Sequence, residues 1–423
     1  MKGDVKYKRV ICIIIVVMLL LSGIVAANAQ QTDEQWLQQG EFYISARDFT
    51  SAIAAFNAAI SINPVYAEAY LLRGNVYFTL RNYDAATADY TKLVELDAGN
   101  AHALIGRALT YEAKGQLPQA IEDYTKVIGL NPAAAKSYYY RANVYRDNGQ
   151  SQQAIADYSK AIELDSGYAV AYYDRATVYC NLGQFPQAIA DYSKAVEVDP
   201  AYVKAYYNRG VIYKQLGQKK KAQADYSKVL TLNPEDVSAL TNRGAIFQEM
   251  GQIELAMADY NKALAINPRH VNAYNNRGLI YQLQGRLDLA LDDYTKALEL
   301  DPLNALIYAK RGAVFNGKGR QEEALADFNK AIALNPSNLL AYYWRGLLYQ
   351  TQGRDKQALA DYNKAISLQP NLSDAYFGKG YICEKMGDKT EALQAYGYFL
   401  RYAAPSDGRI EMVKQRIREL SGK

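Results

Sequence analysis

Apolar and aromatic positions recur along this chain with a period of 34 residues. The phrase from Ala258 to Pro268 is one copy, and an aromatic ring stands at its third position. That ring recurs at Phe56, Tyr90, Tyr124, Tyr158, Tyr192, Tyr226, Tyr260, Tyr294, Phe328, Tyr362 and Tyr396. A fixed period of this length, kept over eleven copies, indicates one supersecondary unit stacked on itself.

Each copy has the pattern of two helices. In the copy that spans residues 271–304, Gly278 and Tyr281 share a helical face with Tyr274, since they follow it by four and seven residues. Gly285 interrupts that face, and Pro302 ends a second apolar stripe, because proline cannot continue a helix interior. Gly278 lets the two backbones approach, while tyrosines fill the volume around them. We predict helix–turn–helix hairpins, about 23 helices in all with a final cap, and no strand.

The first copy carries the motif of a known family. It contains Trp36, Gln39, Gly40 and Tyr43, then Ala52 and Phe56, then Pro64. In spacing this resembles the tetratricopeptide repeat, and the resemblance covers residues 33–406. In most later copies Tyr replaces Trp and Arg replaces Leu, while Ala98 and Ser166 stand where proline is expected. The resemblance implies an all-α fold, a right-handed α-solenoid superhelix whose concave groove is lined by the first helix of each repeat.

Both ends of the array have signals of their own. Thr32 and Gln35 have the spacing of a capping box that opens the first helix. Residues 407–423 follow Pro405 and carry one apolar stripe that includes Val413 and Leu420 among charges. We predict that this segment is a C-terminal capping helix, as terminal repeats require.

Residues 1–29 are typical of an export segment. Lys2, Lys6, Lys8 and Arg9 precede an apolar run, and a small-x-small sequence closes it at Ala27–Ala29. This predicts a signal peptide cleaved after Ala29, and an exported protein that is periplasmic or secreted. The alternative is an uncleaved anchor that holds the protein to the membrane, because the apolar run is almost long enough to span. Cys12 begins the apolar run, which argues against a lipoprotein.

Composition excludes several classes of function. The chain carries +4, and the export segment holds four basic residues and one acidic residue, which leaves about +1 elsewhere. No basic field therefore favours nucleic acid as a partner. Cys180 and Cys383 lie six repeats apart, too far for a disulfide in a solenoid, and His102 and His270 lie five repeats apart. Without a metal-ligand cluster, a phosphate loop or a unique acid–base pair, we expect no cofactor and no enzymatic activity.

An ion pair is predicted inside nine repeats. Arg73, Arg107, Arg141, Arg175, Arg209, Arg243, Arg277, Arg311 and Arg345 each share a repeat with Asp89, Asp123, Asp157, Asp191, Asp225, Asp259, Asp293, Asp327 and Asp361. The first copy lacks both residues, and the last has Lys379 but no aspartate. Joint presence and joint loss suggest contact across the hairpin. The alternative pairs each Asp with the Arg of the next repeat, and Asp361 with Lys379.

One flank of the first helix stays small or aliphatic from copy to copy, as in Ala205 and Ile212, and should pack on the preceding repeat. The opposite flank differs in every copy, so it is where a ligand can be recognised. The candidate peptide-binding residues there are Tyr139, Tyr173 and Tyr207, with Lys136, Asn143 and Lys204 one helical turn away, and a second patch of Tyr343 and Phe377. Some members of the family grip a peptide's terminal carboxylate with Lys and Asn from this wall. Tyrosines stand where such a clamp needs Lys, so the clamp is not carried over. The alternative is that tyrosine is a filler that has drifted onto the wall.

Two functions remain in contention from sequence. The first is a non-catalytic scaffold of the cell envelope that binds peptide segments or partner proteins in its concave groove. The second is a membrane-anchored regulatory or assembly subunit of an envelope complex. Both take protein or peptide partners and no nucleic acid, and both involve the membrane only through an uncleaved N-terminus.

Overall fold

A computed structural model describes residues 31–422, and every regular element in that range is an α-helix. The described chain divides into two compact units, the first ending at Pro200 and the second beginning at Ala201. The division falls in the turn between two hairpins, after the helix that ends at Val198 and before the one that begins at Val203, so each hairpin lies within one unit. The predicted export segment, residues 1–29 with Cys12, lies outside the described residues.

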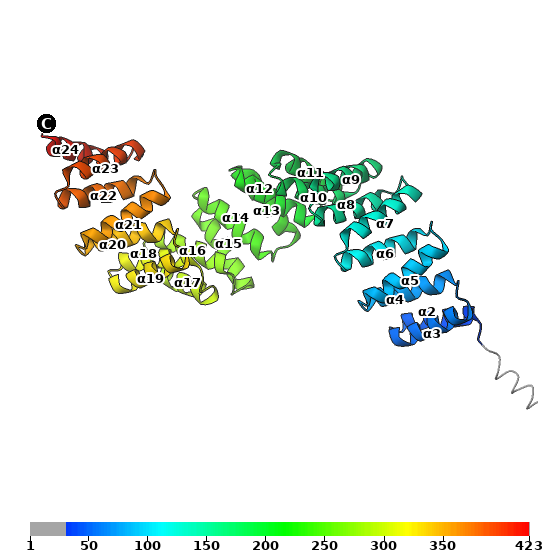
Figure 1. Cartoon of the computed structure of the whole chain (residues 1–423). Helices are drawn as coiled ribbons and strands as arrows, with labels where there is room; N and C mark the ends of the chain where they lie inside the picture. The colour runs from blue at the N-terminus through cyan, green and yellow to red at the C-terminus, as the bar shows by residue number, and fades with distance from the viewer. Residues whose placement is uncertain (1–30, 423) are drawn as a thin grey trace, which may run out of the picture. The chain divides into compact units, whose positions relative to one another are not determined.

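Each repeat is a pair of helices packed on one another (Figure 1). The described part of the first unit contains α2 (Asp33–Ser45), α3 (Phe49–Ile62), α4 (Ala67–Thr79), α5 (Tyr83–Leu96), α6 (Ala101–Ala113), α7 (Leu117–Leu130), α8 (Ala135–Asp147), α9 (Ser151–Leu164), α10 (Ala169–Asn181) and α11 (Phe185–Val198). The described part of the second contains α12 (Val203–Gln215), α13 (Lys219–Leu232), α14 (Val237–Glu249), α15 (Ile253–Ile266), α16 (Val271–Leu283), α17 (Leu287–Leu300), α18 (Ala305–Gly317), α19 (Gln321–Leu334), α20 (Leu339–Thr351), α21 (Asp355–Leu368), α22 (Ser373–Lys385), α23 (Lys389–Tyr402) and α24 (Ile410–Ser421). These 23 helices, with no strand among residues 31–422, confirm the predicted all-α solenoid of hairpins.

Local sequence explains where the helices begin and turn. The predicted capping box is present, since the Gln35 amide donates to the Thr32 hydroxyl at 3.1 Å and the Thr32 amide donates to the Gln35 side chain at 3.0 Å. Between the two helices of nine repeats stands a glycine in the left-handed region, such as Gly149 with a φ of 73°. The first two repeats place Arg47 and Arg81 there, each with a φ of 58°.

The core of each hairpin is the recurring aromatic ring. Tyr294 is fully buried, and a Cβ added at Gly278 would lie 3.1 Å from its ring. The predicted role of Gly278 in close helix approach is therefore confirmed. Neighbouring repeats join through small and aliphatic side chains, because Val144 packs with Ala108 and Tyr124 of the preceding repeat.

All nine predicted Arg–Asp pairs form within their own repeats. The shortest N–O distance in each lies between 2.6 and 2.8 Å, and every aspartate in the set is buried. The alternative pairing with the next repeat is wrong, since Asp361 bonds Arg345 and Lys379 bonds Glu391 at 2.9 Å. These pairs fix the separation of the two helices in each hairpin.

The array closes on α24. Val413 is fully buried and packs with Tyr396 and Phe399 of the last hairpin. The helix begins at Ile410, a few residues after the start of the predicted segment, because Asp407 accepts hydrogen bonds from Arg409 in a turn. None of the helices between residues 31 and 422 has the length and apolar character that a membrane crossing needs.

Candidate functional site

The first helix of each repeat has a face that is only partly covered. We number the places of a repeat from the first residue of its first helix, so place 1 is Asp33 in α2 and Ala67 in α4. The first-helix stripe comprises places 2, 5, 6, 9, 12 and 13 of every repeat. The sequence-predicted site residues all lie on it: Tyr139, Tyr173, Tyr207, Tyr343 and Phe377 at place 5, Lys136 and Lys204 at place 2, and Asn143 at place 9.

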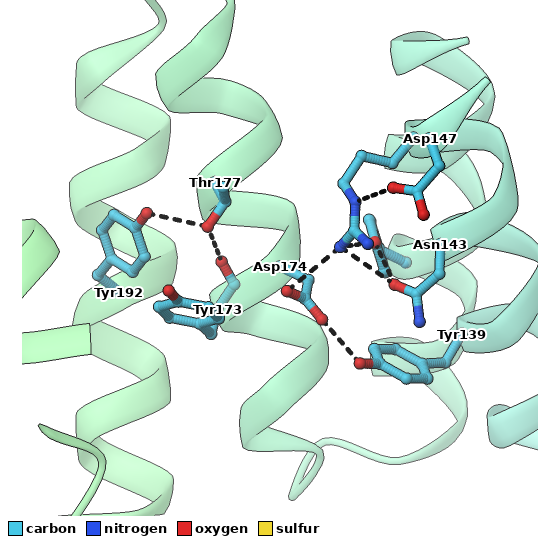
Figure 2. Close-up of polar contacts among 9 residues, drawn as sticks. Tyr139, Asn143, Asp147, Tyr173, Asp174, Thr177 and Tyr192 are labelled. Carbon is cyan, nitrogen blue, oxygen red and sulfur yellow. Dashed lines mark hydrogen bonds and ion pairs between the residues drawn. The ribbon is translucent and has the colours of Figure 1, made fainter. Parts of the chain in front are cut away.

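Tyr139 links two repeats instead of standing clear of the wall (Figure 2). Its ring is half-buried, 5.9 Å from the ring of Tyr158 and 5.1 Å from that of Tyr168. Its hydroxyl donates to Asp174 on α10 at 2.7 Å. Burial, together with the Asp174 carboxylate, raises the pKa of Tyr139 above its ordinary value. The hydroxyl hydrogen of Tyr139 is therefore already used inside the protein.

Asn143 belongs to the same polar network. Its side-chain oxygen accepts from the Tyr158 hydroxyl at 2.6 Å and from Arg146 at 3.3 Å. Arg146 also forms ion pairs with Asp147 at 2.9 Å and with Asp174 at 3.4 Å. The side-chain oxygen of Asn143 therefore already accepts hydrogen bonds inside the protein, and only its amide hydrogens could be donated to a peptide.

The other two predicted tyrosines pack in the same way against their own hairpins. The ring of Tyr173 lies 5.6 Å from that of Tyr192, and the ring of Tyr207 lies 5.8 Å from that of Tyr226. The Tyr207 hydroxyl accepts from Asn242 at 3.0 Å. Tyr173 belongs to the first unit and Tyr207 to the second. The rings are thus half-covered, and their part in binding stays a prediction.

The remaining predicted residues divide into exposed and covered. Lys136 and Lys204 are exposed at the starts of α8 and α12. Tyr343 packs against Trp344, with ring centroids 5.3 Å apart. Phe377 lies 5.5 Å from Phe399, and the Arg409 guanidinium sits 5.0 Å from the Phe377 ring centroid. The second predicted patch is therefore partly covered by the turn that precedes α24.

The structure reveals a pocket on the stripe that sequence reasoning missed. It lies between α4 and α6, holds about 360 Å³, and is lined by Leu71, Asn75, Phe78, Thr79, Tyr90, His102, Ile105, Gly106 and Leu109. The signal was present in the sequence, because place 5 is aliphatic in these two repeats and place 6 is glycine in the second of them. A pocket of about 440 Å³ elsewhere, beside α17, is lined by charged side chains that include Asp288 and Arg320.

No cluster of three His, Cys, Asp or Glu side chains that could hold a metal ion occurs between residues 31 and 422. Cys180 and Cys383 are both free thiols, and burial raises the pKa of each. A thiol with a raised pKa is a poor nucleophile at neutral pH.

Comparisons with known proteins identify the repeat. Models described as tetratricopeptide repeat match residues 37–101, 101–133, 135–168, 158–190, 203–236, 271–304, 340–372 and 361–394. A further model, described as TPR repeat, matches residues 176–217, 249–285 and 314–353. Together they leave only residues 134, 237–248 and 305–313 unmatched between residues 37 and 394. A search of curated protein sequences found no significant match.

Solved structures to which this chain is similar include other tetratricopeptide repeat proteins. The C-terminal part of a TPR repeat-containing protein from Cytophaga hutchinsonii is 21% identical, over 55% of this chain and 96% of that chain, with a TM-score of 0.50. A tetratricopeptide repeat protein from Parabacteroides merdae is 23% identical, over 60% of this chain and 99% of that chain, with a TM-score of 0.48. YrrB, a TPR protein with an unusual peptide-binding site, is 25% identical, over 44% of this chain and 97% of that chain, with a TM-score of 0.39. With its family models matched along most of its length, the chain belongs to the tetratricopeptide repeat family.

Proposed function

We propose that this protein is a non-catalytic scaffold that binds peptide segments or partner proteins along its first-helix stripe. Tetratricopeptide repeat proteins are typically scaffolds for protein–protein interactions, and this chain has the family's hairpins throughout residues 33–402. The stripe is the surface that the family's concave groove would present. Each repeat would then supply one helix of scaffold and one short segment of binding wall.

The observation that carries the proposal is apolar surface left uncovered on the stripe. Leu283 is 73% exposed, Leu306 45% and Leu340 38%, and they stand at places 13, 2 and 2 of successive repeats. Large exposed apolar side chains that recur on one helix face favour an interaction surface, since leaving them in water is unfavourable. The opposite flank of the same helices is uniform and buried, as at Ala273 and Ile280.

A binding comparison tests this. Leu283→Glu, Leu306→Glu and Leu340→Glu would be combined in one variant, and Leu216→Glu, Leu232→Glu and Leu255→Glu in a second. The second set carries the same chemical change on exposed leucines of the same unit that lie off the stripe. Partners captured from envelope extract by the parent chain would be purified and their affinities for all three proteins measured by calorimetry. We expect the stripe variant to lose binding and the off-stripe variant to keep it; equal binding by all three would contradict the proposal.

The cell envelope is the setting we propose. The basic, apolar and small-residue order of residues 1–29 supports export. N-terminal sequencing of the native protein separates the two envelope functions. A start at Gln30 favours the free scaffold, and an intact Met1 favours the anchored regulatory or assembly subunit.

A further inference from the structure

The pocket between α4 and α6 exists because two places of the stripe carry unusual residues. In the pair of first helices α8 and α10, Tyr139 at place 5 reaches Asp174 at place 6 of the next repeat. The corresponding residues in α4 and α6 are Leu71 and Gly106. Leucine is too short to span the gap and glycine offers no side chain to meet it, so the space stays open.

Only glycine fits at position 106, because the Tyr90 ring that forms the floor of the pocket lies directly against it. A Cβ added there would lie 2.7 Å from the Tyr90 ring, which is closer than real contacts allow. Tyr90 is fixed in turn by its hydroxyl, which donates to Asn75 at 2.7 Å. The result is a largely apolar recess lined by the Tyr90 ring, Phe78, Ile105 and Leu109. The polar side chains of Asn75, Thr79 and His102 also line it. A recess of this kind suits one bulky apolar side chain.

The charged side chains at the stripe places of the first three repeats have one sign. The stripe places of the first three repeats hold four glutamates and no Lys or Arg: Glu34, Glu41, Glu68 and Glu112. Glu34, Glu41 and Glu68 are exposed, and no ion pair among residues 31–422 involves them. Glu68 stands one helical turn before Leu71. Glu112 stands one turn after Leu109, but it is half-buried and accepts from the Tyr124 hydroxyl at 2.6 Å, so the freely exposed carboxylates are those of Glu34, Glu41 and Glu68.

We infer that this recess binds an extended basic peptide segment, with one large apolar side chain in the pocket and flanking Lys or Arg side chains on the glutamates. The inference rests on the proposed function and names the class of partner for repeats one to three. Charge complementarity selects this occupant, since an acidic segment would place like charges against Glu34, Glu41 and Glu68. The apolar residue supplies affinity and the basic residues supply selectivity and salt dependence.

Fluorescence anisotropy with the full chain tests the inference. The probes are three labelled peptides of equal length: a central Phe flanked by Lys, a central Phe flanked by Glu, and a central Gly flanked by Lys. We expect the first to bind most tightly and its affinity to fall as salt rises. Tighter binding of the Glu-flanked peptide, or equal binding of the Gly peptide, would overturn the inference.

Two variants probe the pocket and the charges separately. Leu71→Tyr introduces at place 5 of α4 the residue that α8 has there, Tyr139. The ring beneath it would be Tyr90, which corresponds to Tyr158 in the repeat of α8. This variant should lower the affinity for the Lys-flanked Phe peptide at least about tenfold. Leu182→Tyr, at an exposed turn position, is its control. Glu41→Lys with Glu68→Lys should weaken the same peptide by about tenfold, and Glu235→Lys with Glu254→Lys is the matched control on exposed glutamates of the other unit. If Leu71→Tyr proves unstable by circular dichroism, the exposed glutamate pair still decides; binding unchanged by it would contradict the inference.

The two proposals can fail independently. In one outcome none of the three peptides binds, but the Leu283, Leu306 and Leu340 variant still loses partner binding. That result would reject the basic-peptide site and leave the scaffold function. Peptide binding that depends on Leu71 and Glu68, with partner capture unaffected by those leucines, would reject the wider stripe and leave this site.

Discussion

Arg175 holds Asp191 with two parallel hydrogen bonds, from Nε to Oδ2 and from Nη2 to Oδ1, each 2.7 Å long. The third guanidinium nitrogen donates to Ser159 of the preceding repeat at 2.7 Å. The guanidinium also lies 5.8 Å and 6.0 Å from the ring centroids of Tyr172 and Tyr179. One arginine thereby joins α9, α10 and α11, so the pair binds a hairpin together and ties it to its neighbour.

Removing the carboxylate of this pair should be costly. Asp191→Ala leaves a mostly buried arginine without its partner, and we expect a loss of about 3–5 kcal/mol of unfolding free energy. Arg175→Lys keeps the charge but cannot reproduce the fork, so it should cost about 1–2 kcal/mol. Urea titrations of the full chain would measure both.

The control for this prediction is an exposed pair on the same helix. Lys194 and Glu197 lie 2.8 Å apart on the surface of α11. Glu197→Ala should change stability by less than about 1 kcal/mol, because solvent screens exposed pairs. Losses of similar size for Asp191→Ala and Glu197→Ala would show that the buried pairs are not structural fasteners.

The Arg–Asp pairs were predictable from the sequence, because the arginine and the aspartate occur together in nine repeats at a constant spacing. The sequence did not predict the third bond to the preceding repeat, although small polar residues recur where that bond forms, as at Thr125, Ser159 and Ser227. Periodicity also placed Tyr139 on the stripe without showing how much of its ring is covered. The covered fraction of the ring depends on whether the residue 35 positions later, here Asp174, can accept a hydrogen bond from the Tyr139 hydroxyl. The pocket beside Leu71 was missed for the same reason, since it arises from what two neighbouring residues fail to fill.

A buried hydroxyl gives the second prediction. Among residues 31–422 the Tyr226 hydroxyl is buried and has no hydrogen-bond partner. Phe56 and Phe328 occupy the same place in two other repeats. Tyr226→Phe should therefore stabilise the protein by about 1 kcal/mol, because it removes the cost of burying an unpaired hydroxyl.

Tyr362→Phe is the matched comparison. The Tyr362 hydroxyl donates to the Gln350 side chain at 2.6 Å, and both residues lie in the same unit as Tyr226. Removal of the Tyr362 hydroxyl should lower the unfolding free energy by about 1 kcal/mol, because a buried hydrogen bond is lost. Thermal melts of the two variants should move in opposite directions, and a parallel shift would count against this account of the hydroxyls.

The turn residues give the third prediction. Arg81 adopts a φ of 58°, where other repeats use glycine. The left-handed region costs a residue with a Cβ about 1–2 kcal/mol, part of which the extra chain entropy of glycine offsets. Arg81→Gly should therefore stabilise the first unit by about 0.5–1 kcal/mol.

Gly149→Ala is the reverse experiment. Its φ is 73°, and an added Cβ would meet no atom within 4 Å, so only backbone strain changes. We expect a loss of about 1 kcal/mol in urea titrations. An increase in stability for this variant, or a decrease for Arg81→Gly, would mean that these turns are not limited by conformation.

The last prediction concerns alkaline pH. Burial raises the pKa of Tyr90 to about 12, and burial likewise raises the pKa of Tyr168 to about 12. Burial also raises the pKa of the corresponding core tyrosines in later repeats, among them Tyr226 and Tyr294.

A phenol whose folded pKa lies above its ordinary value of about 10 contributes stability that is complete below that pH and is lost as pH rises toward the folded value. The unfolding free energy should therefore fall between about pH 10 and 12, by about 1.4 kcal/mol per pH unit for each buried phenol that titrates. Urea titrations at about pH 9, 10 and 11 would measure the slope, and Tyr90→Phe should reduce it by about one phenol's share. A stability that is flat over this range would mean that the core tyrosines ionise as freely in the folded chain as in the unfolded one.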